Sequence, residues 1–271
     1  MIFDVFPKLN IFLKILGIKG SYHEIFSRFV LAKGQLKDIV EIKTSENFCL
    51  KGDFGCQQED NLIYRAIIAL EAFLKEHNKD FSMLKNLSIE VQKGIPSGAG
   101  LGGGSADAGM CLRKINEFFD LGLDTATLCL IGSKVGADVA FFASGFESAN
   151  VSGFGEIIER FNEPSYDFEI FVPDVFCDTA NVYRQYDKML QEGALSLSPA
   201  WQNHQENSDK ILFSNTNKSN KDAACGRGSL NDLFYPALRA YPALLHTHNT
   251  LGNEWFFSGS GSSFFRLKGD F

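Results

Sequence analysis

The stretch "KGIPSGAGLGGGSADAG", which runs from Lys93 to Gly109, holds seven glycines in seventeen residues. The preceding "NLSIEVQKG" alternates apolar and polar residues as a β-strand does. Beyond the glycines, Ala108, Leu112 and Ile115 mark one face of a helix. Ordered glycine costs more conformational entropy than any other residue. We therefore expect an ordered strand–loop–helix unit, with a loop whose backbone lies close to another group such as a ligand.

Three interpretations of this loop compete. Glycine-rich segments are commonly flexible linkers, but the buried-type residue Ile95 lies inside this one. Gly98, Gly100 and Gly103 fit the dinucleotide-binding pattern G-x-G-x-x-G, with Asp120 near the expected acidic position. That pattern normally lies in the first strand–turn–helix unit, whereas about ninety residues precede this one.

The third interpretation is a loop that binds a nucleoside triphosphate. Successive N–H groups of glycines that end at a helix N-terminus near Ser105 would point at phosphate oxygens. The helix dipole places the equivalent of roughly half a positive charge there. The sequence contains no G-x-x-x-x-G-K-[ST] motif, which excludes a P-loop NTPase.

Composition limits the classes of function. The chain has 271 residues and a formal net charge of −7, which argues against a general nucleic-acid binder. A small anionic ligand stays possible, because backbone N–H groups make a locally positive pocket. No apolar run approaches the roughly 18 residues of a membrane span, no signal peptide is evident, and six scattered cysteines indicate reduced thiols. We expect a cytoplasmic protein that binds neither membrane nor nucleic acid.

Periodicity along the chain predicts a mixed α and β protein with two domains, divided as residues 1–155 and 156–271. Strands are expected at "FPKLNIFLKILG", "DIVEIKTS", "NFCLKGD", "NLSIEVQKG" and "YDFEIFVPD", and a strand–turn–strand at "EWFFSGSGSSFFRLKG". One helix is expected after Asp60 and Asn61, either of which can cap it, and another after the cap Asp124. The polar stretch from Glu192 to Asp222 predicts a long mobile loop.

The segment P-S-G-A-G-L-G-G-G-S at Pro96–Ser105 resembles the ATP loop of the GHMP kinases. Six further blocks occur in the order found in that superfamily: "PKLNIFL", "GSYHEI", "EDNLI", "GADVAFF", "NDLF" and "SGSGSSFF". The set is most similar to the kinases of 4-diphosphocytidyl-2-C-methyl-D-erythritol, in the non-mevalonate isoprenoid route. Small departures occur at Ala106, Gly20–Ser21 and Ala140, and relatives often extend beyond the position of Phe271.

The resemblance implies an α+β fold of two domains. The first would be an α/β domain similar to domain 2 of ribosomal protein S5, the second a ferredoxin-like α+β domain, with the active site in the cleft between them. It also implies ATP as co-substrate with Mg²⁺, for which no ligand residue is assigned. The ATP-binding residues would be Pro96, Ser97, Gly98, Ala99, Gly100, Leu101, Gly102, Gly103, Gly104, Ser105 and Ala106.

Asp138 and Lys8 are the candidate catalytic residues that the resemblance implies. Asp138 would accept the proton of the attacking hydroxyl, and Lys8 would keep Asp138 ionised and neutralise charge on the transferred phosphoryl group. From the residues alone, Asp138 is as well explained as a helix cap or a buried hydrogen-bonding aspartate. Lys8 is as well explained as a solvated lysine at a strand edge.

The substrate residues follow from the same resemblance. Tyr22 and His23 would recognise the cytidine base, with Tyr183 as the stacking aromatic on its other side. Asn10 shares a strand face with Lys8 and would bond polar groups of the substrate. Gly259 and Gly261 would bring the backbone close to the substrate in the second domain, unless they form a plain hairpin turn. A monomer or weak homodimer acting on a small molecule is expected. Another GHMP kinase, acting on homoserine or mevalonate, and a catalytically silent nucleotide sensor are the alternatives.

Overall fold

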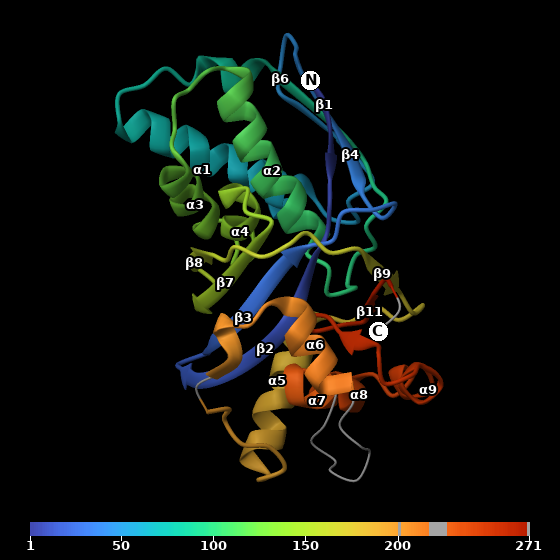
Figure 1. Cartoon of the computed structure of the whole chain (residues 1–271). Coiled ribbons are helices and arrows are strands. Elements are labelled where there is room, and N and C mark those ends of the chain that lie inside the picture. The colour runs from blue at the N-terminus through green and yellow to red at the C-terminus, as the bar shows by residue number, and fades with distance from the viewer. Residues whose placement is uncertain (200–201, 217–226, 270–271) are drawn as a thin grey trace. The chain divides into compact units, whose positions relative to one another are not determined.

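The computed structural model describes residues 1–199, 202–216 and 227–269 (Figure 1). These residues form two compact units, each assembled from segments that alternate along the chain. The first unit comprises residues 1–7, 33–95 and 102–146. The second comprises residues 8–32, 96–101 and the described residues from 147 onward.

The first unit is a four-stranded sheet covered by helices. Its strand order is β1-β4-β6-β5, antiparallel except for β5, which runs parallel to β6. The strands are β1 (Ile2–Val5), β4 (Asp38–Thr44), β5 (Cys49–Gly52) and β6 (Leu87–Gln92). The helices, gathered on one side of the sheet in Figure 1, are α1 (Leu62–Glu76), α2 (Gly103–Phe118), α3 (Thr125–Ser133) and α4 (Val139–Ser144). Two short 3-10 helices, η1 (Gln58–Asp60) and η2 (Ser82–Asn86), precede α1 and β6.

Local sequence explains where these helices begin. The side chain of Asn61 accepts a hydrogen bond from the amide of Ile63, and that of Asp124 accepts one from Thr127, both at 2.8 Å. The cap Asp124 is therefore confirmed, and of the two candidates for α1 the cap is Asn61 and not Asp60. Helix α2 begins at Gly103, two residues before the position expected from sequence, because Gly102 takes a left-handed conformation (φ 71°) at the N-cap.

Glycines set the position of α4 in the first unit. A Cβ atom at Gly109 of α2 would lie 2.8 Å from the carbonyl oxygen of Val139. A Cβ at Gly132 of α3 would lie 3.2 Å from the main chain of Ala140. Both helices therefore pack directly on the backbone of α4, whose six residues are all buried. This packing holds the first turn of α4, which follows Asp138.

The second unit contains two antiparallel sheets. One has the order β2-β3-β7-β8, and the other has the order β10-β11-β9. The strands are β2 (Lys8–Lys19), β3 (Tyr22–Leu31), β7 (Ser148–Gly153), β8 (Ile157–Arg160), β9 (Phe168–Phe171), β10 (Phe256–Phe257) and β11 (Phe264–Leu267). The helices are α5 (Thr179–Gln191), η3 (Gln202–Gln205), α6 (Ser208–Thr216), α7 (Arg227–Leu230), α8 (Phe234–Ala240) and α9 (Leu244–Thr250).

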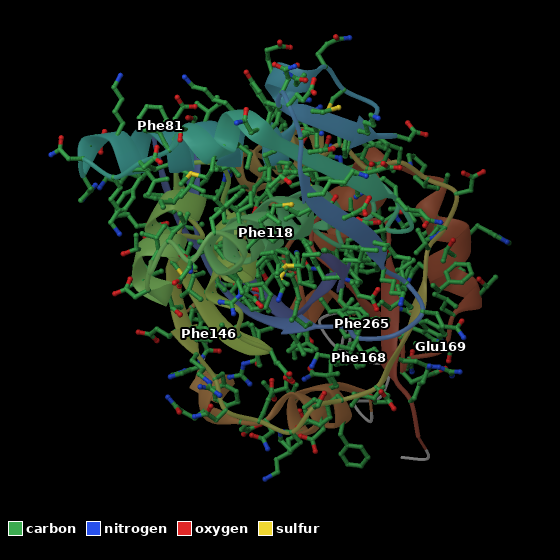
Figure 2. The ribbon with its side chains drawn as sticks, turned by 90° about the horizontal axis from the view of Figure 1, so that it is seen from above. Phe81, Phe118, Phe146, Phe168, Glu169 and Phe265 are labelled. Atoms are coloured by element: carbon green, nitrogen blue, oxygen red, sulfur yellow. The ribbon has the colours of Figure 1, made fainter. Side chains whose placement is uncertain are left out.

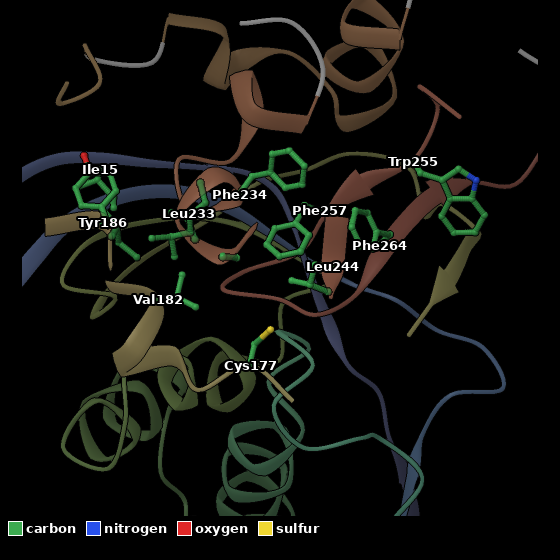
Figure 3. Packing of buried hydrophobic residues seen from close by; sticks show 13 residues of the cluster. Ile15, Cys177, Val182, Tyr186, Leu233, Phe234, Leu244, Trp255, Phe257 and Phe264 are labelled. Atoms are coloured by element: carbon green, nitrogen blue, oxygen red, sulfur yellow. The ribbon is translucent and has the colours of Figure 1, made fainter. Parts of the chain in front are cut away.

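Aromatic rings dominate the core of the second unit. Figure 3 shows Phe257 beside Phe234 and Phe264, each pair with ring centroids 5.2 Å apart. A second pair, Phe168 and Phe265, joins β9 to β11 at 5.9 Å and is labelled in Figure 2. Each ring buries a large apolar area, so these few residues contribute much of the hydrophobic stabilisation of the unit.

The structure corrects the expectation of a mobile loop over Glu192–Asp222. Residues 202–205 form η3 and residues 208–216 form α6, whose Ile211 and Leu212 are buried. Positions 217–222 lie outside the described residues. The polar composition misled because the segment is held largely by hydrogen bonds to one buried ion pair, Arg28 and Glu163, which lies outside it.

The compact units do not follow chain order, since β2 and β3 belong with β7 and β8. The domain division at residues 155/156 stays a prediction. No helix in the described part of the chain combines the length and the apolar character needed to cross a membrane.

Candidate active site

The glycine loop has a repeating backbone conformation. Gly98, Gly100 and Gly102 have φ of 65°, 72° and 71°, in the left-handed region, while Ala99 and Leu101 between them do not. Alternation of this kind turns successive N–H groups toward one side of the chain and makes a concave anion-binding nest. Only glycine adopts such angles without strain. The loop is therefore an ordered segment and not a linker, and phosphate binding by it stays a prediction.

Four consecutive carbonyl oxygens attach the first half of this loop to the second unit. The carbonyls of Gly98, Ala99 and Leu101 accept from the main-chain amides of Cys177, Ser263 and Lys8, each at 3.0 Å. That of Gly100 accepts from the Ser258 hydroxyl at 3.2 Å. These four bonds fix the backbone of the loop, and with it the direction of its N–H groups. Ala99 and Leu101 are buried and anchor the loop.

The second half of the loop opens helix α2 in the first unit. No side chain caps this helix, so the amides of Gly103, Gly104 and Ser105 remain as donors at its N-terminus. A Cβ at Gly103 would lie 2.9 Å from the side chain of Ile95, so a larger residue does not fit. A sixteen-residue helix directs a positive dipole end at this point, which favours phosphate.

A cluster of buried charged residues holds the chain at Gly94 and Ile95, just before the loop. The sequence analysis did not predict this cluster. Asp38 accepts from the amides of Gly94 and Ile95 at 2.6 and 2.8 Å. Lys93 bridges Asp38 and Asp107 at 2.5 and 2.7 Å. Burial raises the pKa of the Asp107 carboxyl to about 7, against the opposing effect of Lys93. The signal in the sequence was Lys93 and Asp107, the only charged residues of the opening stretch.

Lys8 is buried at the start of β2, only 4% exposed, which excludes a solvated strand-edge lysine. Its ammonium lies 4.6 Å from the ring centre of Phe29 and donates to Asn10 Oδ1 at 2.5 Å. Asn10 is equally buried, and its Nδ2 donates to the Ser27 hydroxyl at 2.9 Å. A buried, oriented cation of this kind stabilises developing negative charge far better than one in water.

Asp138 occupies the N-cap position of α4 in the first unit. Its side chain makes no capping hydrogen bond, so the interpretation as a helix cap is wrong. The residue is half-buried. Its position is set by the close packing of α4 on Gly109 and Gly132. Its role as a base stays a prediction.

Of the predicted base-binding residues, the second unit brings together His23 and Tyr183, whose rings lie 4.6 Å apart. His23 Nε2 lies 2.6 Å from Asp187 Oδ1, a partner that sequence reasoning missed. Tyr22 is 67% exposed and packs on Phe154, with ring centres 5.7 Å apart. All three predicted residues therefore lie in one unit, with Tyr183 and Asp187 one turn apart on α5.

Gly259 and Gly261 lie against the glycine loop, within the second unit. A Cβ at Gly259 would lie 2.9 Å from the carbonyl oxygen of Gly100, and a Cβ at Gly100 would lie 2.9 Å from Gly261 N. Asn231 Nδ2 donates to the carbonyl of Gly259 at 2.9 Å and holds this turn in place. The close approach is thus between two backbones. A contact of Gly259 and Gly261 with substrate stays a prediction.

Comparison with known proteins identifies the family. Residues 61–146 match the model for the GHMP kinases N terminal domain. A 4-diphosphocytidyl-2-C-methyl-D-erythritol kinase of Helicobacter acinonychis (strain Sheeba) is 45% identical over 98% of this chain and 96% of its own. The chain belongs to the family of 4-diphosphocytidyl-2-C-methyl-D-erythritol kinases. A member from Sulfurimonas denitrificans is 42% identical over 98% of this chain and 97% of its own.

Solved structures agree with this family and with its fold. A crystal structure of 4-(cytidine 5'-diphospho)-2C-methyl-D-erythritol kinase matches with a TM-score of 0.71 and 27% identity, over 98% of this chain and 90% of the other. Mevalonate kinase of Methanococcus jannaschii matches with a TM-score of 0.58 at 12% identity, over 98% and 90% of the two chains. The second likeness shows the fold alone. The predicted GHMP kinase fold is confirmed.

No metal ligands are assigned in this member of the kinase family. In the described ranges, no group of three or more His, Cys, Asp or Glu side chains is placed to hold a metal ion.

Proposed function

We propose that this chain transfers the γ-phosphoryl group of ATP to the 2-hydroxyl of 4-diphosphocytidyl-2-C-methyl-D-erythritol. The observation that carries the proposal is the left-handed conformation of Gly98, Gly100 and Gly102, in a loop whose carbonyls are bonded to the framework. The amides of this loop would donate hydrogen bonds to phosphate. Relatives at 45% identity carry the name of this kinase. The phosphates of ATP would lie along Pro96–Ala106, and Mg²⁺ would arrive with the nucleotide.

Phosphoryl transfer needs positioning and charge stabilisation more than covalent chemistry. Asp138 accepts the proton of the substrate hydroxyl as that oxygen attacks the γ-phosphorus. The Lys8 ammonium stabilises the negative charge on the transferred group, in a site where burial strengthens the interaction. Asn10 holds Lys8 and faces the polar groups of the substrate.

The base of the substrate is assigned to His23 and Tyr183. The 4.6 Å ring contact gives an aromatic surface with a hydrogen-bonding edge, which suits a nucleobase and has no use for mevalonate or homoserine. Tyr22 covers the other side of the base when substrate binds. We place the reaction in the cytoplasm, performed by a monomer or weak homodimer without nucleic acid or membrane.

One assay tests the substrate. Purified protein is incubated with ATP, Mg²⁺ and the cytidine diphosphate substrate, and ADP is measured. Homoserine and mevalonate serve as matched alternative acceptors. ADP release with the cytidine substrate alone supports the proposal. Release with mevalonate or homoserine instead would assign another GHMP activity, and no release with any acceptor would favour a nucleotide sensor.

The catalytic roles are tested by Lys8→Ala and Asp138→Asn. Each variant should lower kcat by at least about a thousandfold, because general-base and electrostatic contributions each reach that range. The melting temperature and ATP binding, measured on the same preparations, should show that both variants are folded. A folded variant with near-native turnover would remove that residue from the mechanism.

A further inference from the structure

Ser27 of β3 lies behind the candidate catalytic lysine, and its side chain is completely buried. Its hydroxyl donates to the carbonyl oxygen of Phe12 at 2.5 Å and accepts from Asn10 Nδ2 at 2.9 Å. The β2–β3 pairing shifts register between Asn10 and Phe12. Such an irregularity re-aims a side chain, and here it lets one serine contact both residues of the neighbouring strand.

The hydrogen bonds of Ser27 allow only one orientation of the Asn10 amide. A hydroxyl has a single proton, and that of Ser27 is given to the Phe12 carbonyl. Its lone pair therefore faces Asn10 and accepts only from the Nδ2 end of the amide. The Oδ1 end of the amide therefore faces Lys8 and accepts from its ammonium, which can only donate. The reversed amide would place NH₂ against the ammonium.

We propose that Ser27 is a positioning residue for phosphoryl transfer, acting by fixing the amide orientation of Asn10 and through it the ammonium of Lys8. This rests on the proposed function of Lys8. A lysine side chain is a flexible stem with three rotatable donors, so its charge is placed only by what accepts from it. Phe29 supports the ammonium from its ring face, and Asn10 Oδ1 supplies a directional contact within the second unit.

The first test compares Ser27→Ala with Ser27→Thr and with Ser148→Ala. Ser148 is a matched control, since it is a buried serine of β7 in the same sheet whose hydroxyl donates to Glu163, away from Lys8. Ser27→Ala should lower kcat about tenfold or more, the effect of about 1.4 kcal/mol lost from the transition state. The KM for ATP should stay unchanged. Ser27→Thr keeps the hydroxyl and should restore most of kcat, while Ser148→Ala should keep native kcat.

The second test uses Asn10→Asp, because a carboxylate has two equivalent oxygens and no wrong orientation. In that background, adding Ser27→Ala should leave kcat unchanged relative to Asn10→Asp alone. A further tenfold loss there would show that Ser27 acts through packing and would overturn the proposal. If Ser27→Ala does not fold, Ser27→Cys supplies the same comparison with a much weaker hydrogen-bonding group.

The outcomes separate this inference from the proposed function. A wild-type protein that phosphorylates no acceptor contradicts the proposed function. An active wild type with an inactive Lys8→Ala variant and a fully active, folded Ser27→Ala variant contradicts the role of Ser27 alone. An equal loss of kcat in Ser148→Ala would also overturn it, because any buried serine of the sheet would then suffice.

Discussion

Gly100 meets two requirements at once. Its φ of 72° disfavours any side chain, and a Cβ there would lie 2.9 Å from the main-chain nitrogen and oxygen of Gly261. The left-handed conformation by itself costs a non-glycine residue about 1–2 kcal/mol. The close approach adds a displacement of the loop, so the nest should lose its shape.

We therefore predict that Gly100→Ala raises the KM for ATP by at least about tenfold, equivalent to about 1.4 kcal/mol of lost binding. Gly122→Ala is the control, because Gly122 has φ of 64° and no atom within 4 Å of its Cβ position. Gly122→Ala should lose only the stability that the left-handed conformation costs, whereas Gly100→Ala should lose more, because its Cβ also meets the main chain of Gly261. A native KM in Gly100→Ala would contradict the phosphate-binding nest.

Asp107 should make stability depend on pH. Burial raises the pKa of its carboxyl to about 7 in the folded chain, against an unfolded value of about 3.9. Folding favours the protonated carboxyl. The stability that Asp107 contributes is therefore fully present below pH about 4 and is lost as the pH rises through 7.

We predict that the free energy of unfolding depends on pH differently in the wild type and in Asp107→Asn. Between pH 5 and 8 the free energy of unfolding of the wild type should fall relative to that of the variant, which cannot ionise. Urea denaturation at one-unit pH intervals measures the difference. A difference that stays constant over this range would mean that Asp107 keeps its charge throughout.

At the scale of elements, buried charge attaches α6 and η3 to the sheet of the second unit. The Arg28 guanidinium donates to Asn150 Oδ1 at 2.9 Å and to the carbonyls of Glu206 and His204. It lies 3.4 Å from the ring centre of Phe161. Burial lowers the pKa of Arg28 to about 10, so it stays charged near neutrality.

Glu163 is the second buried charged residue that contacts this segment. Its carboxylate lies 3.9 Å from the Arg28 guanidinium and accepts from the hydroxyls of Ser148 and Ser208 and from the amide of Ser208, at the start of α6. A polar segment without a strong apolar stripe is thereby ordered through a buried pair. Both charges are needed, because either one alone would be buried without compensation.

Removing one charge should release the segment. We predict that Arg28→Met lowers the free energy of unfolding by about 3–5 kcal/mol, the cost of leaving a buried charge unpaired. Hydrogen exchange should increase over residues 204–216. Lys43→Met, at the exposed pair with Glu41, is the control and should leave the melting temperature unchanged. Native exchange rates in Arg28→Met would show that α6 is held by other contacts.

At the scale of the whole molecule, the chain enters each compact unit more than once. Leu13, Ile15 and Ile25 of β2 and β3 pack in one cluster with Leu233, Phe257 and other residues that follow position 155 (Figure 3). A division at residue 155 therefore separates the two sides of this core, although the first unit lies wholly before it.

This interleaving predicts the behaviour of fragments. Residues 1–155 expressed alone should aggregate, because the apolar face of β2 and β3 has lost its partners. Co-expression with residues 156–271 should restore soluble protein, as judged by gel filtration. A soluble 1–155 fragment with a cooperative unfolding transition would instead support the domain division expected from sequence.

Much of the architecture was accessible from local patterns. The strands at β2, β4, β5, β6 and β9 follow from alternation, and the starts of α1 and α3 follow from Asn61 and Asp124. Strand β3 was missed, because Tyr22 and His23 look like a surface turn when read alone. Pairing with β2 and β7 makes that segment a strand.

The sequence by itself gave evidence of the fold family through seven short motifs in the family's order, and that resemblance alone suggested the pair Lys8 and Asp138, whose roles stay predictions. The ordered glycine loop followed from the residues, because only glycine readily takes the left-handed backbone conformation. Only the tertiary structure decided that Lys8 is buried, that Asp187 meets His23 and that Asn10 donates to Ser27. It also decided that a polar segment becomes α6. The physical reason is distance along the chain: Asp187 and His23 are 164 positions apart, and strand pairing and burial alone bring such groups together.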